Sequence, residues 1–203
     1  MTTFFLIRHA VCRGLGQTLW GRTPGICLND TGQIQAQCLA DRFKDLSLDA
    51  IYSSPLQRAL ETAQVIGKGV NLEVKTSDAV NEIDFGEWTG KTFDELSGDD
   101  RWRHFNNRRS MTTIPGGESF LEVQNRIVKE LEALAVEHGR AHVAIISHAD
   151  VIRAAVAYFS AIPIDLIERF EISPCSVSVV AVNDDNATLL TLNNTGELTE
   201  LRT

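Results

Sequence analysis

Paired cysteines, long apolar runs and an excess of positive charge are all missing from this sequence. Its four cysteines, at positions 12, 27, 38 and 175, form no CxxC pair, so neither a zinc site nor a disulfide scaffold is indicated. No apolar run approaches the roughly 20 residues of a membrane-spanning helix, and the first residues lack the pattern of a signal peptide. We therefore expect a cytoplasmic protein with reduced thiols and no membrane partner.

Positive charge is in the minority, because 19 Lys and Arg stand against 27 Asp and Glu, for a formal net charge of −8. Nucleic-acid-binding domains are usually basic on at least one face, so no nucleic-acid partner is expected. An anionic substrate would have to be attracted by a local group of arginines. With 203 residues, 43% of them hydrophobic, the chain can bury one sizeable core, and we predict a single domain over residues 1–203.

Apolar segments typical of strands alternate along the chain with segments typical of helices. Short apolar runs predict strands at residues 3–7, 48–54, 72–77 and 141–147. Apolar residues at helical spacing predict helices at residues 29–43, 55–67, 119–139 and 150–161. Residues 176–194 are typical of two strands around an Asp-Asp-Asn turn. This order predicts an α/β three-layer sandwich, with a mostly parallel central sheet, helices on both faces and an antiparallel edge strand.

Two local features refine this outline. Ser54 and Pro55 stand where the second helix begins, so we expect Ser54 to cap that helix and Pro55 to be its first residue. Residues 81–115 are polar and lack a long periodicity. They predict an excursion over the top of the sheet, with a short helix around residues 93–96.

Polar side chains follow three of the predicted strands. Arg8 and His9 come directly after the first strand, and His148 follows the strand at 141–147. Arg58 lies in the first turn of the helix that follows residues 48–54. Because ligands bind outside the carboxyl ends of parallel strands, we expect these side chains to meet at one edge. Each residue alone has an ordinary structural explanation, and only their convergence indicates a site.

Such a group of residues suits phosphoryl chemistry. The planar fork of an arginine matches phosphate oxygens two at a time, and a helix N-terminus beside Arg58 adds backbone N–H donors. An imidazole flanked by guanidinium groups stays neutral and keeps a lone pair that can attack phosphorus. A leaving alcohol would need a proton, and Glu82 in the excursion is the best candidate to supply it.

Six segments in the same order resemble the motifs of the histidine phosphatase superfamily, the phosphoglycerate mutase-like proteins. The segments are LIRH, LNDTGQIQA, SSPLQRALETA, NEIDFGEWTG, PGGES and SHADVIRA, the first being similar to the family's RHG signature. The resemblance implies metal-independent phosphoryl transfer on a small phosphorylated substrate, with no cofactor. It implies that His9 is the nucleophile that becomes phosphohistidine, and that Arg8 and Arg58 bind the phosphoryl oxygens. By the same resemblance, His148 donates to those oxygens, and Glu82 is the general acid and later the base for the hydrolytic water.

The loop after the first histidine departs from the family pattern. Ala10 replaces the usual glycine, Cys12 occupies a position that is polar in the family, and Leu15 stands where asparagine is frequent. Three nearby side chains could replace the missing phosphate contacts: Arg13, Gln17 and Thr18. Cys12 also raises a hypothesis of oxidative inactivation, although an inert thiol is the favoured interpretation.

Asp150 is a second departure, because a neutral residue is common at this position of the family. It could cap its helix, orient His148, or compete with Glu82 as the acid. We favour the cap, since an aspartate at a helix start is an ordinary stabilising feature.

Two other functions remain open. A phosphoglycerate-type mutase uses the same core, but such mutases tend to carry longer insertions, so the compact excursion here favours hydrolysis. A catalytically weak member that only binds a phosphorylated ligand is suggested by the altered loop. Three other enzyme classes have little support. Gly14-Leu15-Gly16 lacks the third glycine of the motif of a dinucleotide-binding dehydrogenase, and no GxSxG segment of a serine hydrolase occurs. The histidines lack the partners at ligand spacing that a metal hydrolase needs.

Specificity and assembly are the least constrained features. We expect the substrate to be selected by side chains over the mouth of the site: Trp20, Arg22, Trp102, His104 and residues 108–114. Arg108 and Arg109 could bind a second anionic group or be solvated. The predicted edge hairpin allows a homodimer without requiring one.

Overall fold

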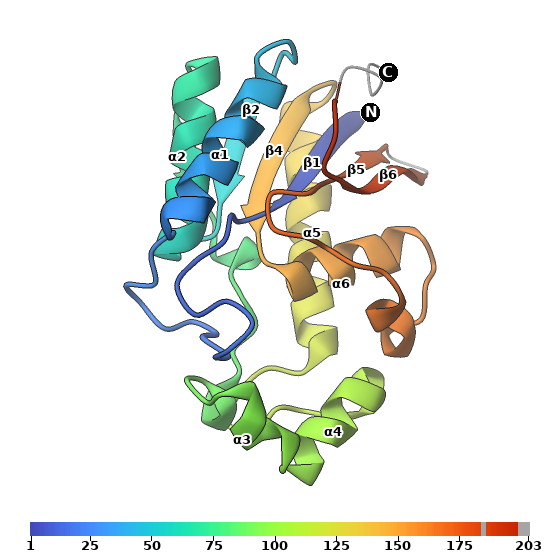
Figure 1. The fold of residues 1–203 in the computed structure, drawn as a ribbon. Coiled ribbons are helices and arrows are strands. Elements are labelled where there is room, and N and C mark those ends of the chain that lie inside the picture. The colour runs from blue at the N-terminus through green and yellow to red at the C-terminus, as the bar shows by residue number, and fades with distance from the viewer. Residues whose placement is uncertain (184–185, 199–203) are drawn as a thin grey trace.

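A mixed sheet of six strands forms the middle layer of the molecule (Figure 1). The computed structural model describes residues 1–183 and 186–198. The strands are β1 (Thr2–Arg8), β2 (Ala50–Ser53), β3 (Val74–Thr76), β4 (His142–Ser147), β5 (Val177–Val182) and β6 (Ala187–Asn194). The helices are α1 (Asp30–Phe43), α2 (Gln57–Val70), α3 (Phe93–Ser97), α4 (Asp100–Asn107), α5 (Phe120–His138) and α6 (Ala149–Phe159). Short 3₁₀ turns occupy Asp78–Val80, Gly86–Trp88, Arg109–Met111 and Ile164–Arg169.

The strand order is β3-β2-β4-β1-β5-β6, and the first four of these strands are parallel. β5 pairs antiparallel with β1, and β6 pairs antiparallel with β5. The predicted three-layer α/β sandwich is confirmed. The C-terminal hairpin lies at the sheet edge as expected, but the reversed strand is β5, second from the edge, and the outermost strand is β6. Residues 184–185 of its predicted turn lie outside the described residues.

The continuous apolar run of β1 follows from its position between two cores. Phe4 and Leu6 join the core under α5 and α6, whereas Phe5 and Ile7 join the core under α1 and α2. A strand covered on both faces needs apolar side chains on both, which is why it shows no alternation. Along the part of the chain that the structure describes, no helix has the length and apolar character needed to cross a bilayer.

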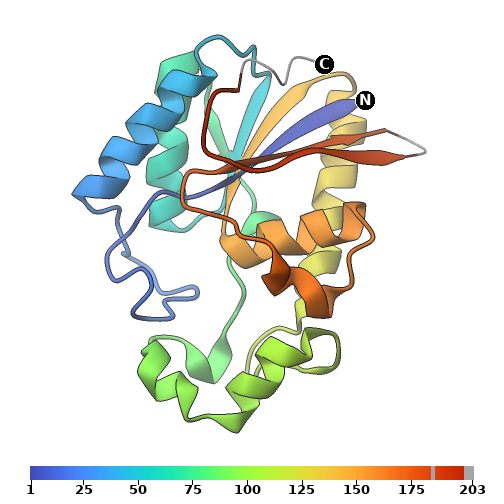
Figure 2. The same ribbon diagram turned by 45° about the vertical axis from the view of Figure 1, so that its right-hand side comes forward.

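The parallel register brings the ends of β1, β2 and β4 to one edge. Arg8 pairs with Ser147, and Ser53 pairs with Ile146, so the residues that follow these strands emerge side by side. The predicted excursion passes beyond this edge, where α3 and α4 form a small helical layer of their own (Figure 2). The short helix expected at 93–96 is present, whereas α4 was not predicted.

Two predicted helix caps are wrong. α2 begins at Gln57 with Leu56 as its cap, and no side chain completes that cap. The Ser54 hydroxyl instead lies 2.8 Å from a ring nitrogen of His148, a contact that local sequence does not reveal. α6 is capped by His148, so Asp150 lies inside the first turn and is not the cap.

Candidate active site

The structure brings four of the predicted site residues into direct contact at this edge. Arg58, near the start of α2, lies with Nε 3.3 Å from His9 Nε2 and with Nη2 3.3 Å from His148 Nδ1. The Glu82 carboxylate lies 3.4 Å from the same His148 nitrogen and 3.8 Å from Arg58 Nη2. The two imidazole rings are 5.2 Å apart, centre to centre. The residue after β1, a residue of α2, one of the 81–85 segment and the residue before α6 therefore form one cluster.

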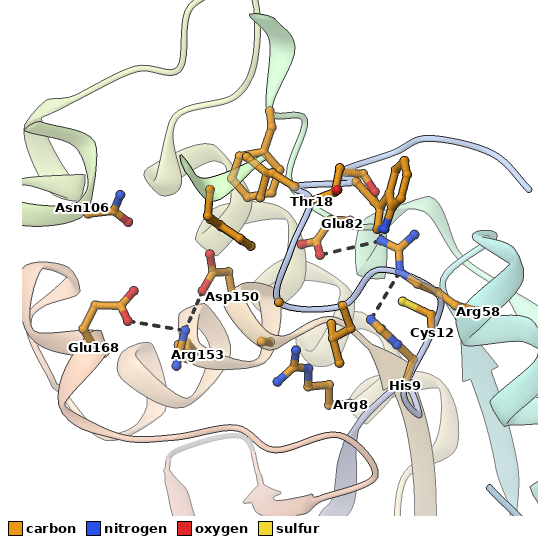
Figure 3. Close-up of a pocket in the computed structure, with 18 of the residues that line it drawn as sticks. Arg8, His9, Cys12, Thr18, Arg58, Glu82, Asn106, Asp150, Arg153 and Glu168 are labelled. Atoms are coloured by element: carbon orange, nitrogen blue, oxygen red, sulfur yellow. Dashed lines mark hydrogen bonds and ion pairs between the residues drawn. The ribbon is translucent and has the colours of Figure 1, made fainter. Parts of the chain in front are cut away.

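A cavity of about 370 Å³ opens onto this cluster, a size that fits a small ligand. Its walls include Arg8, the remaining predicted site residue, together with His9, Arg58 and Glu82 (Figure 3). His148 is fully buried, and its Nδ1 contacts Arg58 and Glu82, which both line the cavity.

His9 presents a bare nitrogen to Arg58. Its Nδ1 lies 2.7 Å from the carbonyl oxygen of Ala10, which can only accept, so Nδ1 carries the ring hydrogen. Nε2 then keeps its lone pair and accepts from Arg58. Burial, followed by the charge of Arg58, holds the pKa of His9 well below its usual value, so the ring is neutral at pH 7.

Two guanidinium groups beside His9 have donors to spare. Arg8 donates from Nη1 to the carbonyl of Ile172 at 2.6 Å, and Arg58 donates from Nη2 to the carbonyl of Gly21 at 2.9 Å. Arg8 Nε and Arg58 Nη1 are buried and have no hydrogen-bond partner among the described residues. Because buried donors are nearly always satisfied, these two indicate a place for an anion.

Glu82 has an environment that favours its protonated form. Burial, with a smaller contribution from the negative charge of Asp150, raises the pKa of its carboxyl group to about 7 against the opposing charge of Arg58. A carboxyl group that holds a proton near neutral pH is suited to general acid catalysis.

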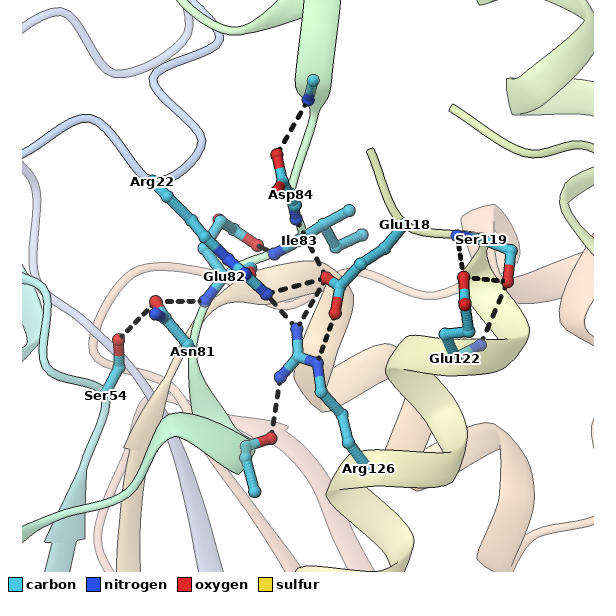
Figure 4. A network of polar contacts seen from close by, with 12 residues as sticks. Arg22, Ser54, Asn81, Glu82, Ile83, Asp84, Glu118, Ser119, Glu122 and Arg126 are labelled. Carbon is cyan, nitrogen blue, oxygen red and sulfur yellow. Dashed lines mark hydrogen bonds and ion pairs between the residues drawn. The ribbon is translucent and has the colours of Figure 1, made fainter. Parts of the chain in front are cut away.

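The backbone of Glu82 is clamped by residues that sequence reasoning missed or placed elsewhere (Figure 4). Its carbonyl accepts from Arg22 Nε at 2.8 Å and from Arg126 Nη2 at 3.1 Å. Glu118 bridges both arginines and accepts from the backbone N–H of Asp84. Arg22 therefore holds Glu82 in place and does not line the cavity mouth. The sequence feature that could have indicated these contacts is Glu118 in the PGGES segment.

The loop after His9 is held from behind. Thr62 accepts from the Ala10 N–H at 3.1 Å and donates to the Arg58 carbonyl at 2.8 Å, which ties the loop to α2. The first turn of α1 packs closely against this loop at Gly32. Only glycine fits there, because a Cβ would lie 1.9 Å from the Val11 carbonyl oxygen. This tie between Ala10 and Arg58 fixes the spacing between the loop and the arginine.

The residues of the loop that follows His9 differ in whether they line the cavity. Cys12 and Leu15 both line the cavity, as does Thr18, whereas the other two proposed substitutes for the phosphate contacts do not. Burial raises the pKa of the Cys12 thiol. A protonated thiol reacts slowly with oxidants, which favours the inert interpretation.

Asp150 and Arg109 form a buried ion pair at the far side of the cavity. Arg109 is only 4% exposed and donates to Asp150 at 3.1 Å, to Asn106 at 2.9 Å and to Glu168. Arg109 is therefore not solvated, although its neighbour Arg108 is exposed. Because Arg109 lines the cavity and its Nε is buried without a hydrogen-bond partner among the described residues, its contact with a second anionic group stays a prediction.

The mouth of the cavity matches the sequence prediction in part. Trp20 and Trp102 line it, whereas His104 is exposed and does not. Sequence reasoning missed Arg153 and Glu168, which line the side opposite His9 (Figure 3). Within the described ranges, no group of three or more His, Cys, Asp or Glu side chains could hold a metal ion.

Comparisons with known proteins agree with this geometry. Phosphoserine phosphatase 1 of Hydrogenobacter thermophilus is 31% identical over 208 residues, covering 98% of this chain and 96% of that protein. The structure of Bacillus stearothermophilus YhfR matches with a TM-score of 0.90 at 27% identity, covering 97% of this chain and 98% of that one. A mutant phosphoserine phosphatase of Entamoeba histolytica, in complex with phosphoserine, matches with a TM-score of 0.86 at 28% identity, covering 98% of this chain and 100% of that one. A family model for the histidine phosphatase superfamily (branch 1) matches residues 4–195. The chain therefore belongs to branch 1 of the histidine phosphatase superfamily and is a phosphatase.

Proposed function

We propose that this phosphatase hydrolyses small phosphomonoesters through a phosphohistidine on His9, without the help of a metal ion. The observation that carries the proposal is the pairing of a bare imidazole nitrogen with unpartnered arginine donors. His9 Nε2 has no hydrogen, and the spare N–H groups of Arg8 and Arg58 lie in the same pocket. A phosphoryl group bound by those arginines would sit within reach of the nucleophile.

In the first step, His9 Nε2 attacks phosphorus while the ester P–O bond breaks. Glu82 gives its proton to the leaving oxygen, so the alcohol departs neutral. Arg8 and Arg58 hold the phosphoryl oxygens, and His148 donates as charge develops on them. Each well-placed donor of this kind contributes about 3 kcal/mol of barrier reduction.

In the second step, the Glu82 carboxylate removes a proton from a water molecule. The water oxygen forms a bond to phosphorus as the N–P bond to His9 breaks, and inorganic phosphate leaves. Glu82 is protonated again at the end, so the cycle returns to its starting state. A carboxyl group with a pKa of about 7 suits both directions of transfer at neutral pH.

Phosphoserine is the substrate that we propose first. The proteins that this chain resembles include phosphoserine phosphatases of Hydrogenobacter thermophilus and Entamoeba histolytica. The cavity side opposite His9 carries both signs of charge, with Arg153 lying 3.0 Å from Asp150 and 3.7 Å from Glu168. Such a rim suits a leaving group with an ammonium and a carboxylate, because each charge of the ligand meets an opposite charge.

A substrate panel in excess chelator tests the proposal. We expect release of inorganic phosphate from phosphoserine, 3-phosphoglycerate and p-nitrophenyl phosphate, with kcat/KM highest for phosphoserine. The His9→Ala variant is expected to be inactive on all three. Loss of wild-type activity in chelator would contradict the metal-free route. Formation of an isomer of 3-phosphoglycerate instead of free phosphate would favour the mutase.

A further inference from the structure

A chain of hydrogen bonds behind the cavity leads from the backbone of Glu82 to the ring of His148. The Glu82 N–H donates to Asn81 Oδ1 at 2.8 Å, and the Ser54 hydroxyl lies 3.2 Å from the same oxygen (Figure 4). Ser54 Oγ in turn lies 2.8 Å from His148 Nε2. Ser54 and His148 are both fully buried, so water does not compete for the contact between them.

The hydrogens along this chain are fixed by the backbone donor at its start. A backbone N–H can only donate, so the Asn81 atom that faces it is the carbonyl oxygen. That oxygen can only accept, and the Ser54 hydroxyl must therefore donate to it. Ser54 Oγ has only lone pairs left for its other partners, the N–H of Leu56 at 3.3 Å and the ring of His148. It follows that His148 Nε2 carries a hydrogen.

The opposite side of the ring leads to the same assignment. Arg58 Nη2 lies 3.3 Å from His148 Nδ1, and a guanidinium group has donors only. Nδ1 then accepts and has no hydrogen in the neutral ring. Glu82 Oε2, 3.4 Å from the same nitrogen, fits this assignment when its carboxyl group carries the proton. Two independent donors, one in the 81–85 segment and one in α2, thus select the same tautomer.

We propose that Ser54 and Asn81 are positioning residues that hold neutral His148 with its hydrogen on Nε2, so that His148 can donate to a phosphoryl group only after Nδ1 has taken up a proton. This inference rests on the proposed function, in which His148 is a donor. Binding of a phosphate dianion is then coupled to the uptake of one proton from solvent. An N–H bond forms at Nδ1, and no bond of the substrate breaks in this step.

Charges around His148 explain why the proton arrives with the ligand. The charged and titratable groups that face the ring come from four parts of the fold: Arg8, His9, Arg58, Glu82 and Arg126. The cations among them disfavour an imidazolium in the empty site, and burial acts in the same direction. A bound phosphate dianion adds negative charge beside these cations and removes that penalty.

Nitrogen NMR of the full chain labelled with ¹⁵N-histidine tests the assignment directly, with His148→Asn identifying the signals. In the free protein we expect Nε2 to show the shift of a protonated nitrogen and Nδ1 that of a bare one. Saturation with inorganic phosphate should protonate Nδ1 as well. A neutral Nδ1–H tautomer in the free protein would overturn the inference, and so would a bare Nδ1 in the phosphate complex.

Variants separate positioning from mere structural support. Asn81→Ala frees the Ser54 hydroxyl to donate to Nε2, so mixed tautomers and about a tenfold loss of kcat with little change in KM are expected. Asn81→Asp keeps an acceptor oxygen and should restore the wild-type signals. Ser53→Ala is the matched control, because this buried hydroxyl bonds only to the Ser54 carbonyl among the described residues and should change neither readout.

The outcomes also distinguish this inference from the proposed function. If Asn81→Ala loses turnover while the His148 signals stay unchanged, Asn81 has only a structural role and the inference fails. The tautomer is read in the resting protein and does not depend on which residue is phosphorylated. A phosphoryl label found on a residue other than His9 would overturn the proposed function and leave this inference intact.

Discussion

Burial acts in opposite directions on neighbouring groups of the site. It raises the pKa of the Glu82 carboxyl to about 7 and holds the pKa values of His9 and His148 well below normal. Near pH 7 the site therefore contains a carboxyl group that is partly protonated and two neutral imidazoles. The proposed nucleophile, His9, then has a lone pair at the same pH at which the proposed acid, Glu82, has a proton, which is the condition that the proposed mechanism needs.

The acid role of Glu82 predicts an effect that depends on the leaving group. Glu82→Gln cannot deliver a proton, so kcat for phosphoserine should fall about 100-fold. The loss for p-nitrophenyl phosphate should be far smaller, because p-nitrophenolate leaves without a proton. Steady-state kinetics on the two esters measures the difference. Equal losses on both would show that Glu82 is not the acid.

The same residue predicts a change in stability with pH. The Glu82 pKa is raised from 4.5 in the unfolded chain to about 7 in the fold, so the folded state binds the proton more tightly between these values. Its contribution is full below about pH 4.5 and is lost as the pH rises through about 7. The Glu82→Gln variant lacks this loss.

Urea unfolding of both proteins at pH 5 and pH 8 measures the effect. The free energy of unfolding of Glu82→Gln, relative to wild type, should be greater at pH 8 than at pH 5 by up to about 3 kcal/mol. Every other titrating group is common to the two proteins, so their contributions cancel in the comparison. An unchanged difference between the two pH values would argue against a raised pKa.

At the scale of elements, the small layer of α3 and α4 is joined to the rest of the molecule by Arg109. This residue follows α4, and its guanidinium group lies between the rings of Phe105 and Phe120, 4.8 Å and 5.1 Å from their centres. Its ion pairs with Asp150 and Glu168 connect the layer to α6 and to the 3₁₀ turn beyond it. This buried cation thus helps to hold the layer over the cavity, together with the buried ring of Phe105 and the hydrogen bonds of Ser110 to Asp165.

Arg109→Ala should therefore destabilise the fold strongly. Removing one partner leaves the Asp150 carboxylate buried with half of its compensation, at a cost of about 3 kcal/mol in the free energy of unfolding. Arg103→Ala is the control, because Arg103 forms an exposed pair with Asp100 on α4 and should cost less than about 0.5 kcal/mol. Urea unfolding of the two variants compares them, and equal effects would contradict the anchoring role of Arg109.

Sequence was sufficient wherever the determining physics is local or is set by strand direction. The apolar run of β1 predicts a strand between two cores, and the parallel order predicts that His9 and His148 emerge together. Prediction from sequence failed where the partner of a side chain is distant in the chain. Serine is a residue type that often caps helices, but the Ser54 hydroxyl contacts the ring of His148, which is 94 residues away in the chain.

The same limit applies to charged residues. Arg109 looks like a solvated cation, because nothing near it in sequence announces that Asp150 and Glu168 will enclose it. Arg22 looks like a residue of the cavity mouth, but the acceptor that fixes it is the carbonyl of Glu82, 60 residues further along. An arginine is buried only where hydrogen-bond acceptors surround its guanidinium group. For these arginines the acceptors belong to elements that are distant in the chain.

At the scale of the whole molecule, a chain with a net charge of −8 presents a pocket that suits an anion. The long-range field does not favour phosphate, so affinity depends on short contacts with Arg8 and Arg58. The proposed mechanism places the chemistry on one edge of one sheet, and it depends on His9 Nε2 being the atom that receives the phosphoryl group.

The most direct test of that claim is a rapid-quench reaction with a ³²P-labelled phosphomonoester in excess chelator, followed by peptide mapping. We expect an acid-labile label on His9, which disappears in His9→Ala and accumulates when Glu82→Gln slows its hydrolysis. A label on another residue, such as the Cys12 thiol that lines the same cavity, would contradict the account, as would full turnover by His9→Ala.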